Sequence, residues 1–306
     1  MTYLIQESDI KLLDSITKYP SILTLHELDK KGRVLDTLVP TSVFSRDAIL
    51  HAYEKIDGEN ARIIFLGDGT DIDYMIGSRK EILYTKGDRI AVSTGNIANF
   101  LKPLAERLAS EFQGLIGLRV CYFEVYGGRT PNSNQYTSDK SQGVRLFDVF
   151  SLNQEELGKM LKEEPIVIAA WRDNGGQPYW TCNGREEFAR EHHLETAPQV
   201  AILTGKEVPL TYKDTLLWLS QFTDTKVGIN QFGASEGVVV RTPDRKQIVK
   251  IRFEDYEKRF RFEEHEKWQR KVQKQQNQLR KIQDQVQNST LDMSYEEFIQ
   301  EIQDND

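Results

Sequence analysis

The chain has 306 residues, of which 39% are hydrophobic and 28% are charged, and its mean hydropathy is −0.55. This length can bury a full core, either as one large domain with an appendage or as two domains. The composition argues against a membrane protein, because no apolar run is long enough to cross a bilayer, and two cysteines are too few for a disulfide framework.

The N-terminus and the cysteines predict a cytoplasmic location. Residues 1–20 lack the basic segment, the apolar stretch and the small-residue cleavage site of a secretory signal. Cys121 and Cys182 have no metal-ligand spacing. We expect both to be buried thiols, which suit a reducing compartment.

The net charge of −7 argues at first against a nucleic-acid partner, because phosphate contacts need Lys and Arg. The charge is unevenly distributed, however. Residues 241–281 hold 14 basic and 7 acidic side chains, whereas residues 282–306 hold no basic and 7 acidic ones. On charge alone, a solvated helix face is the simpler interpretation of the basic run.

The predicted elements begin with a hairpin at residues 23–39, where alternating apolar runs flank a Lys-Lys-Gly turn. Between Thr94 and Phe112, apolar residues recur at helical spacing and predict an amphipathic helix that packs on the core. Short strand-like runs are found at 118–126, 144–150, 165–171, 236–241 and 247–253.

The last part of the chain is predicted to be helical, because neither Gly nor Pro occurs after Pro243. One helix is predicted over about 254–287. Its apolar stripe consists of Trp268, Val272, Leu279, Ile282 and Val286. A capping box from Ser294 to Glu297 predicts the start of a second helix.

Side-chain alternation along the predicted strands separates apolar from polar positions. In the last strand, Lys250 and Arg252 face away from Val249, Ile251 and Phe253. Glu236 falls on the same face as Val238, and Glu124 shares a face with Tyr122 and Tyr126. These carboxylates and cations can therefore line one pocket, although a salt bridge would also account for Glu124.

Lys55 is followed by Asp57 and Gly58 and is preceded by apolar and small residues. Alone, this pattern is typical of a surface turn. A buried lysine can instead become a nucleophile, since desolvation and neighbouring cations lower its pKa, by as much as ~3–5 units when burial is complete.

The order of the further motifs resembles the covalent nucleotidyltransferase superfamily of polynucleotide ligases and capping enzymes. Lys55 to Gly58 corresponds to its nucleophile motif. The other similar elements are Ser78-Arg79, Tyr122–Gly127, Phe147-Asp148, Glu236–Val240 and Lys250–Arg252. The resemblance covers about 50–253.

This resemblance implies an α+β fold. The nucleotidyltransferase core, which is ATP-grasp-like with antiparallel sheets and flanking helices, would form an adenylyltransferase domain over residues 1–253. A short helical C-terminal appendage would occupy residues 254–306.

The resemblance also implies roles for individual residues. Lys55 would attack the α-phosphate of ATP and retain AMP, and the catalytic residues would be Lys55, Glu236, Lys250 and Arg252. The nucleotide would be bound by Glu54, Arg79, Glu124 (ribose), Phe147 (adenine) and Lys250 (α-phosphate). Mg²⁺ or Mn²⁺ would be held by Glu236 and Glu124. RNA would be contacted by Asn60, Arg79 and Asp148.

One departure from the family is Arg252, where many members have a second lysine. Arginine keeps the charge and gains bidentate phosphate geometry, but it lacks the compact ammonium. The role of Arg252 is therefore open at this point.

Within the superfamily, Asn60 after Lys55 resembles RNA ligases of the nick-sealing type. DNA ligases and capping enzymes carry a C-terminal OB barrel, and the 53 residues after Phe253 contain no Gly or Pro to build one. NAD-dependent ligases need a domain before the nucleophile, for which 54 residues are too few.

The expected function is therefore ATP-dependent joining of RNA 3′-hydroxyl and 5′-phosphate ends, as in RNA repair. The alternatives are a catalytically silent RNA-binding module of the same fold, and a minimal DNA ligase or capping-type enzyme. For the tail, RNA binding and packing or dimerisation both remain open.

Overall fold

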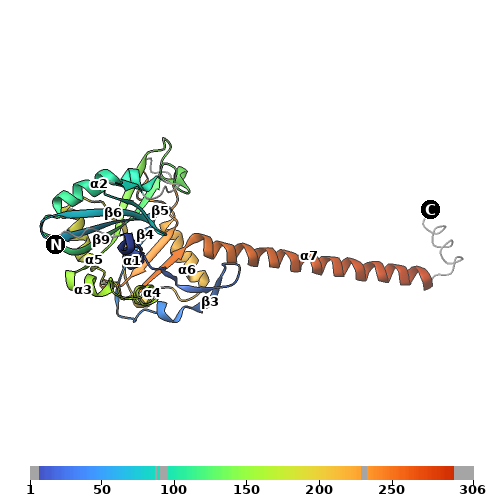
Figure 1. Cartoon of the computed structure of the whole chain (residues 1–306). Helices are drawn as coiled ribbons and strands as arrows, with labels where there is room; N and C mark the ends of the chain where they lie inside the picture. Colours follow the sequence, from blue (N-terminus) through green and yellow to red (C-terminus); the bar gives the residue numbers. More distant parts are fainter. Residues whose placement is uncertain (1–6, 87, 90–95, 229–232, 293–306) are drawn as a thin grey trace. The chain divides into compact units, whose positions relative to one another are not determined.

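The computed structural model describes residues 7–86, 88–89, 96–228 and 233–292. Its contacts divide the chain into a first unit that ends at Tyr256 and a second unit that begins at Glu257. The first unit contains two main sheets with flanking helices, which confirms the predicted α+β class (Figure 1).

The five-stranded sheet has the order β1 (Leu23–Thr24), β13 (Ile248–Arg252), β12 (Gly237–Arg241), β4 (Ile49–Lys55) and β11 (Gln199–Thr204). The six-stranded sheet has the order β10 (Gln142–Leu152), β9 (Ile116–Gly127), β5 (Glu59–Asp68), β6 (Ile72–Ser78), β7 (Ile82–Thr85) and β8 (Asp88–Arg89). Apart from the parallel pair β1 and β13, neighbouring strands in these two sheets are antiparallel.

The predicted N-terminal hairpin is confirmed between β2 (His26–Leu28) and β3 (Val34–Leu38), which pair in antiparallel fashion. Its turn depends on Gly32, whose φ of +73° lies in the left-handed region that favours glycine. Leu23 and Thr24 do not join the hairpin but pair with β13 instead.

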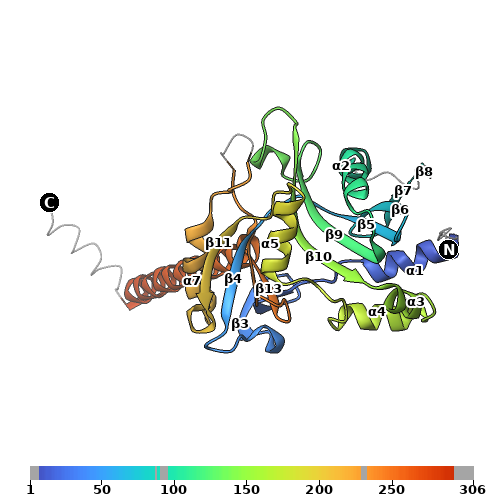
Figure 2. The same ribbon diagram turned by 90° about the vertical axis from the view of Figure 1, so that its left-hand side faces the viewer.

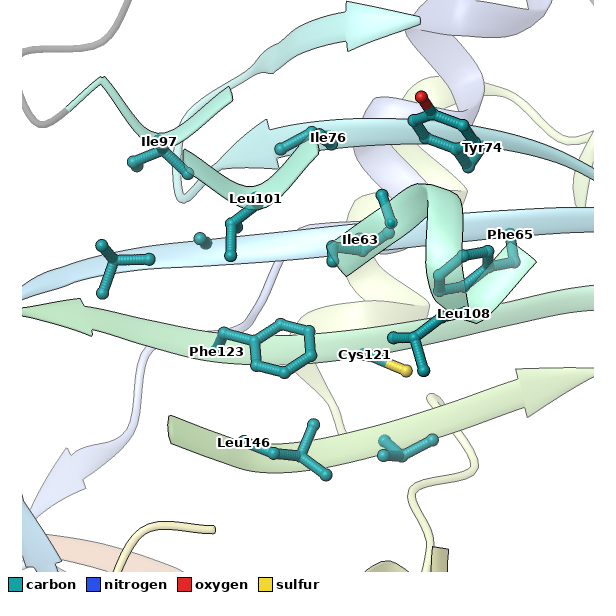
Figure 3. Packing of buried hydrophobic residues seen from close by; sticks show 14 of the residues in the cluster. Ile63, Phe65, Tyr74, Ile76, Ile97, Leu101, Leu108, Cys121, Phe123 and Leu146 are labelled. Atoms are coloured by element: carbon teal, nitrogen blue, oxygen red, sulfur yellow. The ribbon is translucent and has the colours of Figure 1, made fainter. Parts of the chain in front are cut away.

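Helix α2 (Ile97–Glu111) covers one face of the six-stranded sheet (Figure 3). Leu101 and Leu108 pack there against Ile63, Phe65 and other buried side chains of β5, β6 and β9. The helix predicted from apolar spacing is therefore confirmed. Both cysteines are buried and unpaired, as expected.

The opposite face of the same sheet is covered by three helices, α1 (Glu7–Thr17), α3 (Gln154–Met160) and α4 (Pro165–Asp173) (Figure 1). Ile64 and Val120 point to this face because strand side chains alternate. Helices α5 (Cys182–Glu191) and α6 (Tyr212–Leu219) complete the first unit.

The prediction of a strand at 165–171 is wrong, because this segment forms α4. Pro165 occupies the first helical turn, where its missing N–H leaves no bond unmade. Only Ile168 is fully buried, while Ile166 is 79% exposed. A short apolar run does not distinguish a strand from a helix with one buried face.

The five-stranded sheet buries the face predicted to be apolar. Val249 and Ile251 lie in a core with Leu50, Ala52 and Val238. Lys250 and Arg252 consequently face the other side of β13, where they line a cavity. The predicted alternation along this strand is confirmed.

The alternation predicted for Glu236 is wrong, because Glu236 lines the cavity whereas Val238 is buried in the core. Between them, Gly237 has φ +152° and interrupts the pleat. A Cβ at Gly237 would lie 2.1 Å from the carbonyl oxygen of Ile251, so the close approach of β13 requires glycine.

Helix α7 (Phe253–Asp292) confirms the predicted tail helix and extends it to 40 residues. Trp268 of the predicted stripe is 61% exposed. The side chains of Leu279, Ile282 and Val286, and the predicted second helix start at Ser294, lie outside the described residues. In the described ranges, no helix combines the length and apolar character needed to cross a bilayer.

Replacing Gly237 with alanine tests the close approach of β12 and β13. We expect Gly237→Ala to lower the free energy of unfolding by roughly 2 kcal/mol or more, because the backbone must shift to admit a Cβ. The matched control is Gly158→Ala in α3, where a Cβ meets no atom within 4 Å. This control should raise stability by about 0.5–1 kcal/mol. Equal effects of the two substitutions in urea unfolding would contradict the prediction.

Candidate active site

A cavity of about 600 Å³ is lined by residues of both main sheets, which lie next to each other in Figure 2. The five-stranded sheet contributes the ends of β4, β12 and β13, and the six-stranded sheet contributes β5, β6, β9 and β10. All ten site residues predicted from the sequence line this cavity: Glu54, Lys55, Asn60, Arg79, Glu124, Phe147, Asp148, Glu236, Lys250 and Arg252.

Lys55 is the last residue of β4, and its ammonium forms an ion pair with the carboxylate of Glu236. The backbone fixes this pair, since Glu236 N donates to Lys55 O at 3.1 Å and Gly237 is paired with Lys55 in the sheet. The two side chains are 25% and 19% exposed. The expected nucleophile therefore lies in the cavity with a carboxylate against it.

The turn after Lys55 is hydrogen-bonded to β9 and to the connection between β9 and β10. Asp57 N donates to the Tyr136 hydroxyl at 2.6 Å, and Gly58 N donates to Glu124 Oε1 at 3.2 Å. A Cβ at position 58 would lie 2.3 Å from the carbonyl oxygen of Val125. The glycine of the motif is thus needed for packing against β9, and the resulting contact orients Glu124.

Two of the cavity carboxyls have raised pKa values. The pKa of Glu124 is raised to about 7, mainly because the carboxyl is buried; the charge of Lys55 opposes this shift and the charge of Glu236 adds to it. Burial also raises the pKa of Glu54, which accepts hydrogen bonds from the Thr225 hydroxyl and from Lys226 N. Glu124 therefore titrates near neutral pH.

The cations of the cavity lie close enough to influence one another. Burial lowers the pKa of Lys250, and the charges of Arg252, Lys55 and Arg79 lower it further. Arg252 donates to Asp255 through Nε and Nη2, at 2.9 and 2.8 Å, while its Nη1 lies 3.9 Å from Glu236 Oε1. The guanidinium thus links Glu236 to Asp255. Its planar group contacts one carboxylate on each of two sides.

Phe147 and Asp148 both line the cavity, although neighbours on a regular strand face opposite ways. The register of β10 against β9 shifts between Leu146 and Asp148, which is a β-bulge at Phe147. Bulges of this kind re-aim side chains next to active sites. The strand signal alone could not reveal this irregularity.

Asp148 is only 1% exposed, and its carboxylate already has three partners. Tyr19 Oη donates to it at 2.6 Å, Arg241 Nη1 at 2.6 Å and Arg245 Nε at 2.7 Å. The expected contact of Asp148 with RNA stays a prediction, whereas its bonds within the protein give it a role in holding the cavity wall.

Asn60 and Arg79 lie at the side of the cavity formed by β5 and β6. Arg79 is exposed and donates to Ser21 Oγ at 3.0 Å. The buried Asn60 Oδ1 has no hydrogen-bond partner among the residues that the structure describes. Arg79 is therefore an exposed donor at the cavity, whereas the unpaired Asn60 Oδ1 is an acceptor, and the contact of Asn60 with RNA stays a prediction.

The carboxylates fit a metal ion that arrives with phosphate. In the described ranges, no cluster of three or more His, Cys, Asp or Glu side chains could hold a metal on its own. Glu124 and Glu236 nevertheless interact with each other and with Lys55. Mg²⁺ is usually bound by one or two carboxylates together with substrate phosphates and water, so this pair is suitable.

Several cavity residues were not predicted, including Tyr19, Tyr53, Arg185 and Arg241. Side-chain alternation along β12, the strand that pairs with β13, could have identified Arg241, because Val239 and Arg241 point to the same face. No local pattern marks Tyr19 or Arg185, because long-range packing brings them to the cavity.

Comparisons with known proteins agree with this geometry. A profile of the RNA ligase family matches residues 49–260. No curated protein sequence matches the chain significantly. The Naegleria gruberi RNA ligase with pyrophosphate has a TM-score of 0.50 and 14% identity, over 80% of this chain and 58% of that chain. A variant of that ligase with ATP and Mn gives 0.49 and 14%, with the same coverage.

This chain therefore spans less than two thirds of the length of the Naegleria gruberi ligase chains. At 14% identity, the likeness to the pyrophosphate-bound structure shows a shared fold.

The raised pKa of Glu124 predicts a pH-dependent effect on stability. The proton on Glu124 stabilises the folded state fully below the unfolded pKa of about 4.3, and this contribution is lost as pH rises through about 7. Glu124→Gln removes the cost of ionisation. Its stability relative to wild type should therefore increase between pH 5 and pH 8 in urea unfolding.

The control for this experiment is Glu155→Gln. A hydrogen bond from Lys159 lowers the pKa of this exposed carboxyl, so it is ionised throughout the same pH range. Its effect on stability should not change between pH 5 and pH 8. A constant difference between Glu124→Gln and wild type would show that burial does not raise the pKa of Glu124.

Proposed function

Because this chain belongs to the RNA ligase family, we propose that it joins RNA 3′-hydroxyl and 5′-phosphate ends with ATP, through a lysyl-AMP and an RNA-adenylate intermediate. The observation that carries this proposal is the position of Lys55 in a cavity with Glu236, Glu124 and Lys250. The Naegleria gruberi ligase was solved with pyrophosphate, the product that leaves when a lysine takes AMP from ATP.

In the first step, the Lys55 amine attacks the α-phosphorus of ATP. A nitrogen–phosphorus bond forms, the bond to the bridging oxygen breaks, and pyrophosphate leaves. An ammonium has no lone pair, so Lys55 must first give a proton to water and leave its ion pair with Glu236 before it reacts.

Charge on the reacting phosphate has to be offset during this step. Lys250 is the cation we assign to the α-phosphate. Glu236 and Glu124 would hold Mg²⁺ or Mn²⁺, and the bound ion supplies positive charge to the phosphate oxygens. Arg252 keeps Glu236 in place through its contact with Asp255, which suggests a positioning role where the family often has lysine.

The remaining cavity residues recognise nucleotide and RNA. We assign Phe147 to adenine, Glu124 to the ribose and Glu54 to the nucleotide. Asn60 and Arg79 are assigned to the RNA 5′-phosphate end. An oxygen of the RNA 5′-phosphate then attacks the phosphorus of lysyl-AMP, and the bond to Lys55 Nζ breaks. Finally the RNA 3′-hydroxyl loses its proton and attacks the 5′-phosphate, and AMP leaves.

The domain assignment follows from these roles. We propose that residues 1–253 form the adenylyltransferase domain and that 254–306 form a helical appendage that binds RNA. A cytoplasmic location is part of the proposal, supported by the two unpaired buried cysteines.

Substitution of Lys55 tests the covalent step. With ATP and Mg²⁺, intact-mass measurement should show one AMP added to the wild-type protein. Lys55→Ala should show no adduct, and neither should Lys55→Arg, because a guanidinium stays protonated and cannot attack. Lys159→Ala, which changes an exposed lysine of α3, is the control and should still be adenylated. An adduct retained on Lys55→Ala would exclude the assignment.

Glu236 and Lys250 are expected to be required for the same step. Glu236→Gln and Lys250→Ala should each slow adenylation by roughly 10²–10³-fold, the loss typical of one well-placed charged group. Rates are measured by mass, and circular dichroism verifies folding. Rates within a few-fold of wild type for both variants would rule out the proposed cavity chemistry.

We assign the RNA-binding role of the tail to cations in the middle of α7. Upstream cations on α7 are paired, as in Arg261 with Glu257 and Arg270 with Glu266. Residues 272–281 contain the basic residues Lys274, Arg280 and Lys281 and no acidic ones. Their side chains are exposed. The net positive charge of this segment suits it to release counterions from RNA phosphate.

Replacing Lys274, Arg280 and Lys281 with alanine together should weaken sealing of a pre-adenylated RNA nick, whereas lysine adenylation should be unchanged. The slope of log affinity against log salt should decrease by about 2–3, since three phosphate contacts are lost. A control with Gln273, Gln276 and Gln278 replaced by alanine keeps the charge. Identical salt slopes for the two triple variants would assign the tail to packing or assembly.

A further inference from the structure

The connection between α1 and β1 lies against the cavity, although it precedes the residues matched by the family profile. Tyr19 and Ile22 line the cavity. Tyr19 is 8% exposed, so its ring is packed into the wall and still reaches the hollow. We refer to residues 18–22 as the N-terminal strap.

Hydrogen bonds from Tyr122 and Gln177 hold the end of α1 and the start of the N-terminal strap. The Tyr122 hydroxyl donates to Thr17 O at 2.7 Å. Gln177 Nε2 donates to Ile16 O at 2.8 Å and to Lys18 O at 3.1 Å. Such bonds are costly to leave unmade inside a protein. The strap is therefore an ordered part of the cavity wall.

Tyr19 is the centre of contact between the strap and the expected adenine site. Its ring is perpendicular to Phe147, with centroids 5.0 Å apart and an interplanar angle of 89°. Edge-to-face pairs of this kind fix the orientation of both rings. A base that stacks on Phe147 would consequently lie next to Tyr19, since both side chains line one cavity.

The carboxylate of Asp148 accepts a hydrogen bond from the hydroxyl of Tyr19 at 2.6 Å. The same carboxylate binds Arg241 and Arg245, both of which are almost completely buried. The Arg245 guanidinium lies 5.0 Å from the Tyr19 ring centroid. Because Arg241 and Arg245 also bind the Asp148 carboxylate, the position of the carboxylate is fixed, and it orients the hydroxyl of Tyr19.

The other end of the strap contacts the phosphate side of the cavity. Ser21 Oγ accepts a hydrogen bond from Arg79 Nη2 at 3.0 Å, and Arg79 is the residue assigned to the 5′-phosphate. The strap therefore touches both the base side and the phosphate side.

We propose that the N-terminal strap forms one wall of the nucleotide site, in which Tyr19 contacts the purine and Asp148 is a positioning residue that orients Tyr19 and Phe147. This proposal rests on the proposed function, because it concerns the same ATP site. It places residues outside the matched 49–260 range in direct contact with the nucleotide.

The test measures the rate of lysine adenylation against ATP concentration, by intact mass, on the full-length protein. Tyr19→Ala should raise KM for ATP about tenfold and leave kcat within about threefold, since it removes ground-state contacts to the base. Tyr19→Phe keeps the ring and removes the bond to Asp148, so KM should rise by about threefold.

A matched control distinguishes the site from general stability. Tyr256→Phe removes an equally buried hydroxyl, which contacts His26 Nδ1 at 2.8 Å in another part of the core. Its KM for ATP should equal that of wild type. If Tyr19→Ala fails to fold, Tyr19→Phe still decides the question.

A double-variant comparison tests the positioning role of Asp148. Asp148→Asn should raise KM for ATP with little change in kcat. Adding Tyr19→Phe should then raise KM by less than it does alone, because Asp148→Asn has already replaced the charged acceptor of the Tyr19 hydroxyl with a weaker neutral one. If the increase in KM of the double variant equals the product of the increases in the two single variants, the positioning role of Asp148 is overturned.

The two proposals fail in different ways. Absence of an AMP adduct on the wild-type protein would overturn the proposed function together with this inference. A normal adduct on wild type, with KM for ATP unchanged in both Tyr19→Ala and Tyr19→Phe, would overturn the strap as a nucleotide wall and leave the proposed function standing.

Discussion

The ion pair between Lys55 and Glu236 is the contact on which the arrangement of the site depends. Lys55 ends β4, and Gly237, directly after Glu236, begins β12 at the position paired with Lys55. Only a glycine at position 237 allows β13 to approach closely enough to complete this junction. The carboxylate is held further by Arg252, whose other partner is Asp255. The strand pairing thus presets the nucleophile and its counter-ion before any nucleotide binds.

Polar side chains from both main sheets line the cavity. The five-stranded sheet buries Val249 and Ile251 in its own core and leaves Lys250 facing the cavity. From the other sheet, Glu124 and the bulge at Phe147 face it. Carboxylates and cations from both sheets therefore line one cavity, which suits a nucleotide with a metal ion, since phosphate needs cations and the metal needs carboxylates.

Sequence patterns predicted the parts of this site that lie on regular elements. Alternation was sufficient for Lys250, and helical spacing was sufficient for α2. Alternation failed at Glu236, where the backbone of Gly237 interrupts the strand pleat. The strand prediction for residues 165–171 failed because a short apolar run fits both a strand and a helix. Tyr19 could not be predicted, because its contacts with Phe147 and Asp148 join residues more than 120 positions apart.

The central claim is that Lys55 leaves Glu236 to become the covalent carrier of AMP in this cavity. A crystal structure of the wild-type protein after incubation with ATP and Mg²⁺ tests it most directly. We expect continuous electron density from Lys55 Nζ to the phosphorus of AMP, the adenine stacked on Phe147 and in contact with Tyr19, and no ion pair between Lys55 and Glu236. Unmodified Lys55 still paired with Glu236, with nucleotide bound at another site, would contradict it.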